Sequence, residues 1–328
     1  MRTPRKIMIT GGCGFIGSNF VRHIINNSPD AEVVNFDALT YAGSLENLRD
    51  IENNPRYRFI KGNICDPRAV SEAMNGADAV VHFAAESHVD RSIEDPAVFA
   101  VTNVVGTQVL LNAAMKLKPE IFVQISTDEV YGSLGPEGYF TEETPLSPNS
   151  PYSASKAGAD MLALACRHTF GLPVVVTRCS NNYGPYQFPE KLIPLFINNA
   201  LHNRPVPLYG DGLNVRDWLH VSDHCKAVDI VMRSGAPGEI YNIGGNNERK
   251  NIEITRLILK ELGKPESLIN YVTDRLGHDR RYAIDSSKIQ RELGWKPEIS
   301  FEDGIRETIR WYRENQEWCR SVGKPVSR

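Results

Sequence analysis

The sequence lacks a long hydrophobic run, a CxxC cysteine pair and a strong excess of charge of either sign. No stretch approaches the roughly 18 consecutive apolar residues of a membrane helix, so we expect no membrane span. The six cysteines are scattered, which argues against a disulfide framework or a zinc ribbon. The 37 basic and 40 acidic residues leave a net charge of −3, too weak a field for non-specific nucleic-acid binding. Because the N-terminal MRTPRKIMITGG has no signal-peptide core, we expect a cytoplasmic protein with reduced thiols.

Short apolar runs alternate with amphipathic stretches through the first half of the chain, a pattern typical of a parallel sheet covered by helices. We expect strands at 6–10, 32–37, 57–63, 79–85, 121–126 and 172–178, and helices at 15–27, 67–76, 101–117 and 150–171. The pattern becomes irregular after residue 180, where Pro, Asn and aromatic residues gather. The sequence therefore predicts an α/β fold with a Rossmann-type, doubly wound parallel sheet in residues 1–180. We expect the chain to return to this sheet domain at about 220–245. The rest of 181–328 is expected to form a smaller, mainly helical substrate domain.

A glycine-rich loop, TGGCGFIGS, follows the first expected strand and opens the first expected helix. Gly11, Gly14 and Gly17 stand where a dinucleotide site needs a tight turn, a close backbone approach to pyrophosphate and close helix packing. Asp37 ends the second strand, where a carboxylate can accept both adenosine ribose hydroxyls. Its charge would repel a 2′-phosphate, and the ALT run that follows offers no arginine, so the expected cofactor is NAD rather than NADP.

Five residues predict the chemistry of the site. Tyr152 and Lys156 lie four apart on one helix face, where an ammonium and a positive nicotinamide ring would lower the tyrosine pKa and make it a general base. Thr127, Asp128 and Glu129 follow the strand at 121–126, at the sheet edge where doubly wound folds bind ligands. Two carboxyl groups exceed what alcohol oxidation needs, so we expect further proton transfers, with one group protonated and the other ionised.

Eight motifs carry a resemblance that extends over essentially the whole chain. GGCGFIG, AAESHVDRS, STDEVYG, SPYSASK, CSNNYGPYQFPEKLIP, NVRDW, YNIGG and DRLGHDRRYAID resemble, in order, the dTDP-glucose 4,6-dehydratases of the extended short-chain dehydrogenase/reductase superfamily. The resemblance implies that dTDP-α-D-glucose is converted to dTDP-4-dehydro-6-deoxy-α-D-glucose and water, in deoxysugar biosynthesis such as that of dTDP-L-rhamnose.

The resemblance also implies a role for each of the five residues. Tyr152 would deprotonate the C4 hydroxyl as hydride passes to NAD, while Thr127 binds that oxygen and Lys156 holds the nicotinamide ribose. Glu129 would then remove the C5 proton and Asp128 would protonate the departing C6 hydroxyl, before hydride returns to C6.

The resemblance assigns two further sets of residues. The NAD set comprises Gly11, Gly14, Phe15, Ile16, Gly17, Asp37, Ala38, Leu39, Thr40, Asn63, Ile64, Phe83, Ala84, Ala85, Glu86, Thr102, Tyr152, Lys156 and Asn182. The nucleotide-sugar set comprises Ser87, Thr127, Asn181, Lys191, Leu192, Pro207, Leu208, Tyr209, Arg216, Asn251, Asp274, Arg275 and His278. Asn63 departs from the acidic residue that often faces the adenine amino group, although its amide oxygen can accept the same hydrogen bond.

Several alternatives stay open at this point. A nucleotide-sugar 4-epimerase shares the glycine loop and the Tyr–Lys pair, a dehydratase could act on a UDP-sugar, and a non-catalytic NAD-binding scaffold could use the same fold. His220 and His224 could suggest a metal site, but Ser222 or Asp223 is expected to cap the next helix and leave His220 outside it, so we expect no metal. Because the family pairs the apolar helices at 101–117 and 157–166 across a two-fold axis, we expect a homodimer through a helix bundle.

Overall fold

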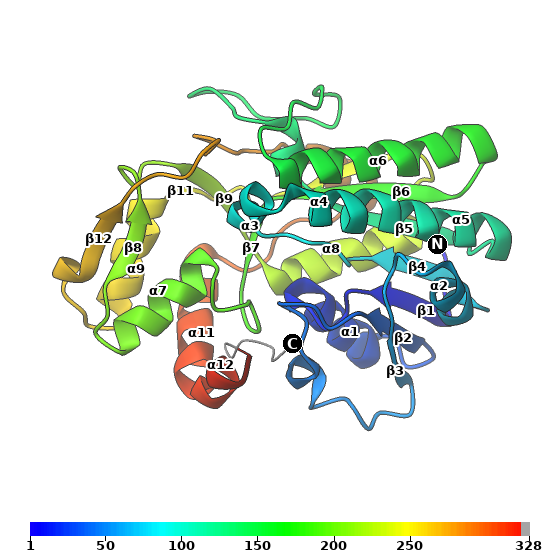
Figure 1. Cartoon of the computed structure of the whole chain (residues 1–328), viewed down its shortest axis with the longest axis horizontal. Coiled ribbons are helices and arrows are strands. Elements are labelled where there is room, and N and C mark those ends of the chain that lie inside the picture. Colours follow the sequence, from blue (N-terminus) through cyan, green and yellow to red (C-terminus); the bar gives the residue numbers. More distant parts are fainter. Residues whose placement is uncertain (323–328) are drawn as a thin grey trace.

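The main sheet of the computed structural model, which describes residues 1–322, has seven parallel strands in the order β10-β6-β5-β4-β1-β2-β3 (Figure 1). The strands are β1 (Lys6–Thr10), β2 (Glu32–Asp37), β3 (Tyr57–Lys61), β4 (Ala79–His82), β5 (Ile121–Thr127), β6 (Val174–Cys179) and β10 (Ile240–Ile243). The predicted doubly wound α/β fold is confirmed. The chain reverses its direction of winding between β1 and β4, which is where such folds open a ligand crevice.

Helices cover both faces of this sheet. On one face α1 (Phe15–Asn27) packs against α8 (Val221–Ser234), and on the other α2 (Pro67–Met74), α5 (Thr107–Leu117) and α6 (Pro151–Phe170) lie side by side (Figure 1). Side chains of one strand alternate between these two cores: Ile7 and Ile9 pack with α1 and α8, whereas Met8 packs with α2 and α5. The chain returns to this region after residue 220, because α8 packs on α1 and β10 pairs with β6.

The helical stretch Pro96–Leu117 corrects one sequence expectation. It joins α4 (Pro96–Phe99), a π-helical segment η2 (Ala100–Gly106) and α5, after the short helix α3 (Val89–Glu94). Among the described residues it is long and apolar enough to cross a membrane, with a mean hydropathy of 1.5, so the expectation that no segment reaches this length was wrong. Uncharged Thr, Asn and Gln residues interrupt its apolar run without adding charge. Its contacts with α6 and α2 are those of a helix packed on a sheet domain.

The rest of the described chain forms a smaller part of helices and two small sheets, left of the main sheet in Figure 1. The sheets contain β7 (Asn181–Tyr183), β9 (Val215–His220) and β11 (Glu248–Lys250), and β8 (Val206–Tyr209) with β12 (Ile269–Val272). Helix α10 (Ser287–Leu293) and the short turns η1 (Leu45–Leu48) and η3 (Asp128–Tyr131) pack on the sheet domain: α10 on β10 and α8, η1 on α1, and η3 on α6. The helices of the smaller part are α7 (Leu192–Leu201), α9 (Asn251–Glu261), α11 (Phe301–Glu314) and α12 (Gln316–Val322), with the short turn η4 (Glu266–Leu268). Their apolar faces enclose a separate core that includes Phe196, Ile258 and Ile305.

Helix α6 has well-defined ends, which fix the position of its first turn. Ser150 and Ser153 form a reciprocal capping box, and Pro151 occupies the first helical position. Gly171 ends the helix with a left-handed backbone, φ +71°. The first turn, with Tyr152, therefore stands at a fixed place beside the carboxyl end of β5.

Candidate active site

The glycine loop between β1 and α1 has no room for side chains. Gly11 has φ +70°, and a Cβ there would lie 2.6 Å from the Ala84 nitrogen. A Cβ on Gly17 would lie 2.2 Å from the Gly11 oxygen. Gly14 is the N-cap of α1, and neither a side-chain cap nor an acidic residue in the first turn occupies the helix N-terminus. The free N–H groups and positive end of the helix dipole suit a pyrophosphate.

A cavity of about 320 Å³ opens over this loop. All but one of the residues assigned to NAD from the sequence line it: Gly11, Gly14, Phe15, Ile16, Gly17, Asp37, Ala38, Thr40, Asn63, Ile64, Phe83, Ala84, Ala85, Glu86, Thr102, Tyr152, Lys156 and Asn182. The exception is Leu39, whose side chain packs against the hydrophobic core of the α1 face. Its backbone is left-handed at φ +55°, which turns the side chain away from the cavity and the N–H toward Asp37.

The backbone fixes the orientation of Asp37. The Cys13 N–H donates to Oδ2 and the Leu39 N–H to Oδ1, each at 2.8 Å. Burial raises the pKa of Asp37, and these two hydrogen bonds oppose that rise. Asn63 has one such contact, because its Oδ1 accepts a 2.9 Å hydrogen bond from the Cys65 N–H and keeps one lone pair for a ligand.

Asp128 and Glu129 lie on one short turn at the end of β5. Thr127 begins this turn, and its hydroxyl accepts the Glu129 N–H at 3.3 Å. Asp128 is 2% exposed, and burial, then repulsion by Glu129 and Asp217, raises its pKa well above the usual value. Its surroundings therefore favour the protonated form of this carboxyl group, the form a general acid requires.

Glu129 faces a different set of charges. Burial raises the pKa of Glu129 above its usual value, while Arg275, Arg216 and Lys191 oppose that rise. Three cations thus favour the ionised form of Glu129, whereas Asp128 has two acidic neighbours. The two adjacent carboxyl groups therefore differ in the way that separates an acid from a base.

Tyr152 and Lys156 lie in the first two turns of α6, but the expected lowering of the Tyr152 pKa is wrong for the protein groups alone. Burial, then the charge of Glu129, raises the Tyr152 pKa well above 10. Burial also lowers the pKa of Lys156, whose Nζ donates to the Ile125 carbonyl at 2.7 Å. The sequence showed the spacing of the pair but neither their burial nor the carboxyl groups that face the phenol.

A second cavity, of about 210 Å³, adjoins the first. It is lined by most of the residues assigned to the nucleotide sugar: Ser87, Asn181, Lys191, Leu192, Pro207, Leu208, Tyr209, Arg216, Asn251, Arg275 and His278. Glu129, Asn182 and Lys191 line both cavities, so the two are continuous at the proposed base. Two assigned residues lie elsewhere: Thr127 lines the first cavity, and Asp274 is exposed and lines neither.

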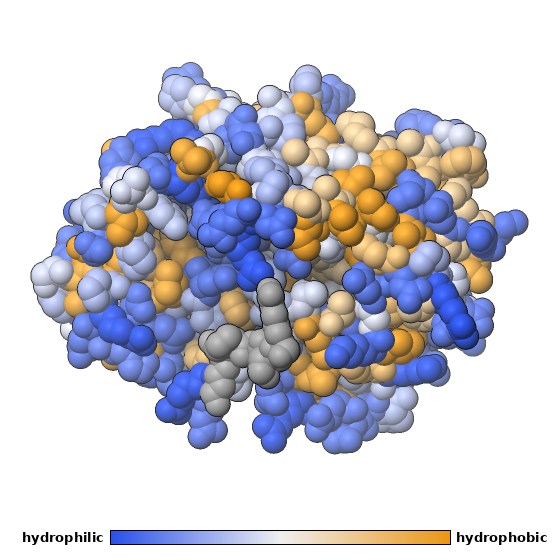
Figure 2. Space-filling view, in the orientation of Figure 1, coloured by the Kyte–Doolittle hydropathy of each residue, from blue (hydrophilic) through white to orange (hydrophobic). Residues whose placement is uncertain are grey.

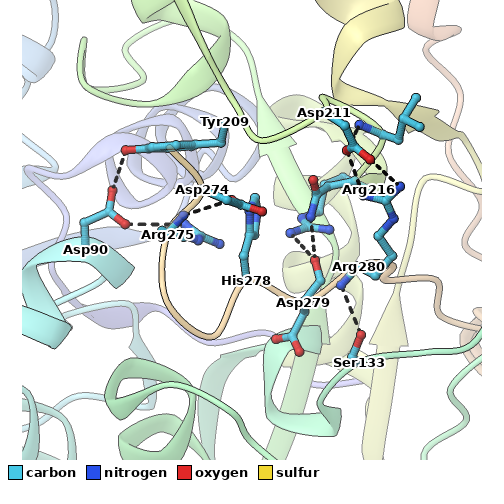
Figure 3. A network of polar contacts seen from close by, with 12 residues as sticks. Asp90, Ser133, Tyr209, Asp211, Arg216, Asp274, Arg275, His278, Asp279 and Arg280 are labelled. Carbon is cyan, nitrogen blue, oxygen red and sulfur yellow. Dashed lines mark hydrogen bonds and ion pairs between the residues drawn. The ribbon is translucent and has the colours of Figure 1, made fainter. Parts of the chain in front are cut away.

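Arg216 and Arg275 line the second cavity together with the rings of Tyr209 and Tyr282, and Figure 3 shows both arginines and Tyr209. The Arg216 guanidinium lies 4.2 Å from the centre of the Tyr282 ring and donates to the Asp279 carbonyl at 2.9 Å. The Nε of Arg275 is buried, and no residue in 1–322 accepts a hydrogen bond from it. These guanidinium groups give an anion forked donors inside the cavity.

Two contacts of Asp90, beside this cavity, join segments far apart in sequence (Figure 3). Asp90 Oδ2 accepts from the Tyr209 hydroxyl at 3.3 Å, and Asp90 Oδ1 lies 3.9 Å from Arg275 Nη1. Four residues apart, Asp274 Oδ1 contacts Nδ1 of the lining residue His278 at 2.5 Å. Asp90 thus connects α3 to the β8 strand and to the loop before residue 282.

Comparison with known proteins decides the family. A model of the GDP-mannose 4,6 dehydratase family matches residues 8–308. A dTDP-glucose 4,6-dehydratase from Streptomyces niveus is 52% identical, the match covering 98% of this chain and 96% of that protein. One from Xanthomonas campestris pv. campestris strain B100 is 55% identical, covering 96% and 95%. The chain belongs to the dTDP-glucose 4,6-dehydratase family. The resemblance of the eight motifs is confirmed.

Solved structures agree with membership of the dTDP-glucose 4,6-dehydratase family. A crystal structure of the enzyme from Streptomyces venezuelae, with NAD and TYD bound, has a TM-score of 0.95 and 52% identity, covering 97% of this chain and 99% of that one. A UDP-glucose 4-epimerase from Thermotoga maritima has a TM-score of 0.88 at 30% identity, covering 95% and 99%. The epimerase shares the fold, but the dehydratases are far closer in sequence.

Among the residues of the second cavity that sequence reasoning missed in this dehydratase family member are Asp90, Glu190, Trp218 and Tyr282. All four lie within motifs already recognised or beside an assigned residue, so the motifs themselves were the available signal. His224 was also missed as a supporting residue: its Nδ1 lies 2.9 Å from Oδ1 of Asn182, which lines both cavities.

The helix cap expected near His220 was wrong. His220 itself caps α8, because its ring accepts the Ser222 N–H, while the Asp223 carboxylate accepts the N–H groups of residues 298 and 299. The expected cap residues follow the helix start and lie inside the first turn. Within the described part of the chain, no group of three or more His, Cys, Asp or Glu side chains is placed to hold a metal ion.

Proposed function

We propose that this chain converts dTDP-α-D-glucose to dTDP-4-dehydro-6-deoxy-α-D-glucose and water, with NAD as a cofactor that is regenerated in each cycle. The observation that carries this proposal is the turn at the end of β5, which presents buried Asp128, whose pKa is raised, beside Glu129. An oxidoreductase or an epimerase on the same fold needs the Tyr–Lys pair but has no use for an adjacent acid and base. Elimination of water needs both.

The residues around the first cavity fit NAD. The glycine loop has no space for a Cβ at Gly11 or Gly17, and the N-terminus of α1 is free for a pyrophosphate. The fixed carboxylate of Asp37 suits two ribose hydroxyls and disfavours a 2′-phosphate. NAD, when bound, accepts a hydride from C4 of the sugar, returns one to C6, and in its oxidised form brings a positive charge.

The oxidation step needs Tyr152 to take the proton of the C4 hydroxyl. The protein groups alone keep the phenol protonated, so Tyr152 becomes a base only when a positive charge joins the site. Thr127 would hold the C4 oxygen, and Lys156, fixed by the Ile125 carbonyl, would hold the nicotinamide ribose. This arrangement ties proton removal to the presence of oxidised cofactor.

The elimination step needs Glu129 and Asp128 to act together. A ketone at C4 acidifies the C5 proton, which Glu129 removes while Asp128 gives its proton to the departing C6 oxygen. Arg216, Arg275 and Lys191 favour the ionised base, and the acidic neighbours of Asp128 favour the protonated acid. The charges around each group therefore favour the state that its role requires.

We also propose a division of the chain between the two ligands. Residues 1–180, with the returning segment at about 220–245, would bind NAD, and the remainder of 181–328 would bind most of the nucleotide sugar. Arg216 and Arg275 in the second cavity support diphosphate binding, since their guanidinium groups offer forked donors. Asn181 and Tyr209 would contact the sugar and the base end of the nucleotide.

Replacing Glu129 by glutamine tests the elimination step. We expect turnover to fall by about 10²- to 10⁴-fold. Exchange of the C5 hydrogen with solvent deuterium should be lost, while reduced cofactor still forms in a single turnover. The matched control is Glu142→Gln, because the Glu142 carboxylate accepts the Asn242 N–H outside both cavities. Full C5 exchange in Glu129→Gln would remove Glu129 from its role.

Product masses distinguish the remaining substrate alternatives. The purified protein is incubated with dTDP-glucose, UDP-glucose and GDP-mannose, each without added NAD. Loss of one water from dTDP-glucose alone supports the proposal, and loss from UDP-glucose supports a UDP-sugar dehydratase. An isobaric product indicates an epimerase, and no product from any sugar supports a binding protein.

We further propose a homodimer formed through the helices that cover one sheet face. Val101, Val105 and Met161 are each more than half exposed, and together with Val98 they form an apolar strip on α4, η2 and α6. Figure 2 shows hydrophobic surface over these helices. Val105→Lys should convert the dimer to a monomer in light scattering, whereas Leu276→Lys, at an exposed leucine away from the strip, should not. A monomeric parent protein would contradict the proposal.

We propose a cytoplasmic location, in keeping with the free thiols of all six cysteines. The product would feed a deoxysugar pathway such as that of dTDP-L-rhamnose.

A further inference from the structure

An aromatic cluster joins the C-terminal helices to the loop that precedes α7. Trp318 of α12 lies 5.0 Å from Trp311 of α11 and 5.8 Å from Tyr186, measured between ring centroids. Tyr186 has a left-handed backbone, φ +68°, a conformation that a large side chain keeps only when its surroundings hold it. The Arg22 guanidinium, 3.9 Å from the centre of the Tyr186 ring, closes the cluster on the α1 side.

The same indole reaches the NAD-binding region through one side chain. Trp318 Nε1 donates to Asn47 Oδ1 at 2.9 Å, and Asn47 Nδ2 donates to the Cys13 carbonyl at 2.8 Å. Cys13 belongs to the glycine loop, and its N–H donates to Asp37. Two side-chain hydrogen bonds therefore connect the C-terminal helix to the loop that fits the pyrophosphate.

The segment between these contacts covers the cofactor cavity. Residues 40–43 line the cavity, and Ser44, which caps η1, donates its N–H to the same Cys13 carbonyl at 3.0 Å. Asn47, on η1, is 2% exposed, so its amide group is fully enclosed by these contacts. A shift of η1 would therefore move both the lining segment and its anchor on the glycine loop.

The aromatic cluster also contacts a second segment of the cofactor-cavity lining, residues 187–188. The Tyr312 hydroxyl donates to the Gln187 carbonyl, and Gln187 and Phe188 line the cofactor cavity. Phe188 packs edge to face against Tyr41, with ring centroids 5.7 Å apart, so the lining segments 187–188 and 40–43 contact each other. Helices α11 and α12 thus support both sides of one cavity from outside the sheet domain.

We propose that Trp318 is a positioning residue for cofactor retention: through Asn47 it holds the 40–48 segment closed over the dinucleotide. The inference rests on the proposed function, because that reaction needs the same cofactor molecule to stay bound between oxidation and reduction. If the reduced cofactor dissociated before the last step, the hydride could not be returned to the oxidised sugar. Trp318 contacts no atom of the reaction and acts only by slowing release.

Trp318→Phe tests this role, since it removes the indole N–H and keeps an aromatic ring in the cluster. We expect NAD release, followed by the recovery of protein fluorescence on dilution, to be about 2- to 12-fold faster, the range expected from one net hydrogen bond. The matched control is Trp295→Phe, because Trp295 Nε1 donates to the Asp223 carbonyl, away from the cavity. The control should release NAD at the parental rate.

The route through Asn47 is tested by a double-mutant cycle. Asn47→Ala removes both the contact with Trp318 and the contact with Cys13, so adding Trp318→Phe to it should accelerate release no further. Additive effects in the cycle, equal release rates for Trp318→Phe and the parent, or equal acceleration by Trp295→Phe would each overturn the proposal. A parent protein that binds no NAD at all contradicts the proposed function instead, so the two failures are distinguishable.

Discussion

Replacing Asp160 by asparagine should lower the free energy of unfolding far more than the loss of one exposed ion pair would. Asp160 of α6 is fully buried, and its Oδ2 lies 3.0 Å from Nε of Arg178, which is 2% exposed. Asparagine keeps the shape but leaves the Arg178 charge buried without its counter-ion, at a cost of about 3–5 kcal/mol. For a chain of this size the melting temperature should fall by on the order of 10 °C.

An exposed ion pair of nearly equal length provides the control. Arg256 Nε lies 3.1 Å from Glu266 Oε2, and these side chains are 56% and 62% exposed. Glu266→Gln should cost about 1 kcal/mol or less, because water solvates the charge that remains. Both variants are compared by thermal and urea unfolding of protein without cofactor. Equal losses in the two variants would refute the reasoning, since burial, not distance, sets the expected difference.

Asp160→Asn should also alter the oxidation step. Asp160 follows Lys156 by one helical turn and opposes the lowering of the Lys156 pKa by burial. Without the carboxylate that pKa should fall further, so Lys156 loses its proton at a lower pH. The rate of reduced-cofactor formation in a single turnover, measured across pH, should therefore decline from a lower pH than in the parent. An unchanged pH profile would restrict Asp160 to a structural role.

Two further predictions concern acid stability and the glycine loop. Burial lowers the pKa of both His82 and His224 from 6.5 to about 3, so their stabilising effect is complete above pH 6.5 and is lost as pH falls toward 3. Urea unfolding at pH 5 should give a free energy lower by about 2 kcal/mol per histidine than at pH 7, and a pH-independent value would contradict this. Gly17→Ala should weaken NAD binding by more than Gly14→Ala in calorimetry, because the new Cβ would lie 2.2 Å rather than 3.3 Å from the Gly11 oxygen. Equal affinities would show that the loop relaxes freely.

The parts of the fold and site that follow local rules were predicted from the sequence. Alternating apolar runs indicated six of the seven sheet strands, and the seventh, β10, lies within the segment expected to rejoin the sheet domain. The glycine loop with Asp37, and the four-residue spacing of Tyr152 and Lys156, depend on neighbours along the chain. In each case one element type and one spacing determine where the side chain points.

The parts that depend on tertiary packing were not predicted. The pKa of Tyr152 rises because of burial and then because of the charges of Glu129 and Asp128 on another element, and spacing cannot reveal either effect. Leu39 lies outside the cavity because its backbone is left-handed. Asp90 meets Tyr209 and Arg275 only because the chain folds these distant segments against each other.

The turn at the end of β5 has a consequence for how the enzyme can move. Asp128 and Glu129 are consecutive residues on one backbone turn, fixed by Thr127, whereas the arginines that face Glu129 belong to the smaller part of the molecule. A hinge motion between the two parts would change the distance from Glu129 to its cations but not the distance from Glu129 to Asp128. Closure of the two parts can therefore change the pKa of Glu129 while the distance between Glu129 and Asp128 stays the same.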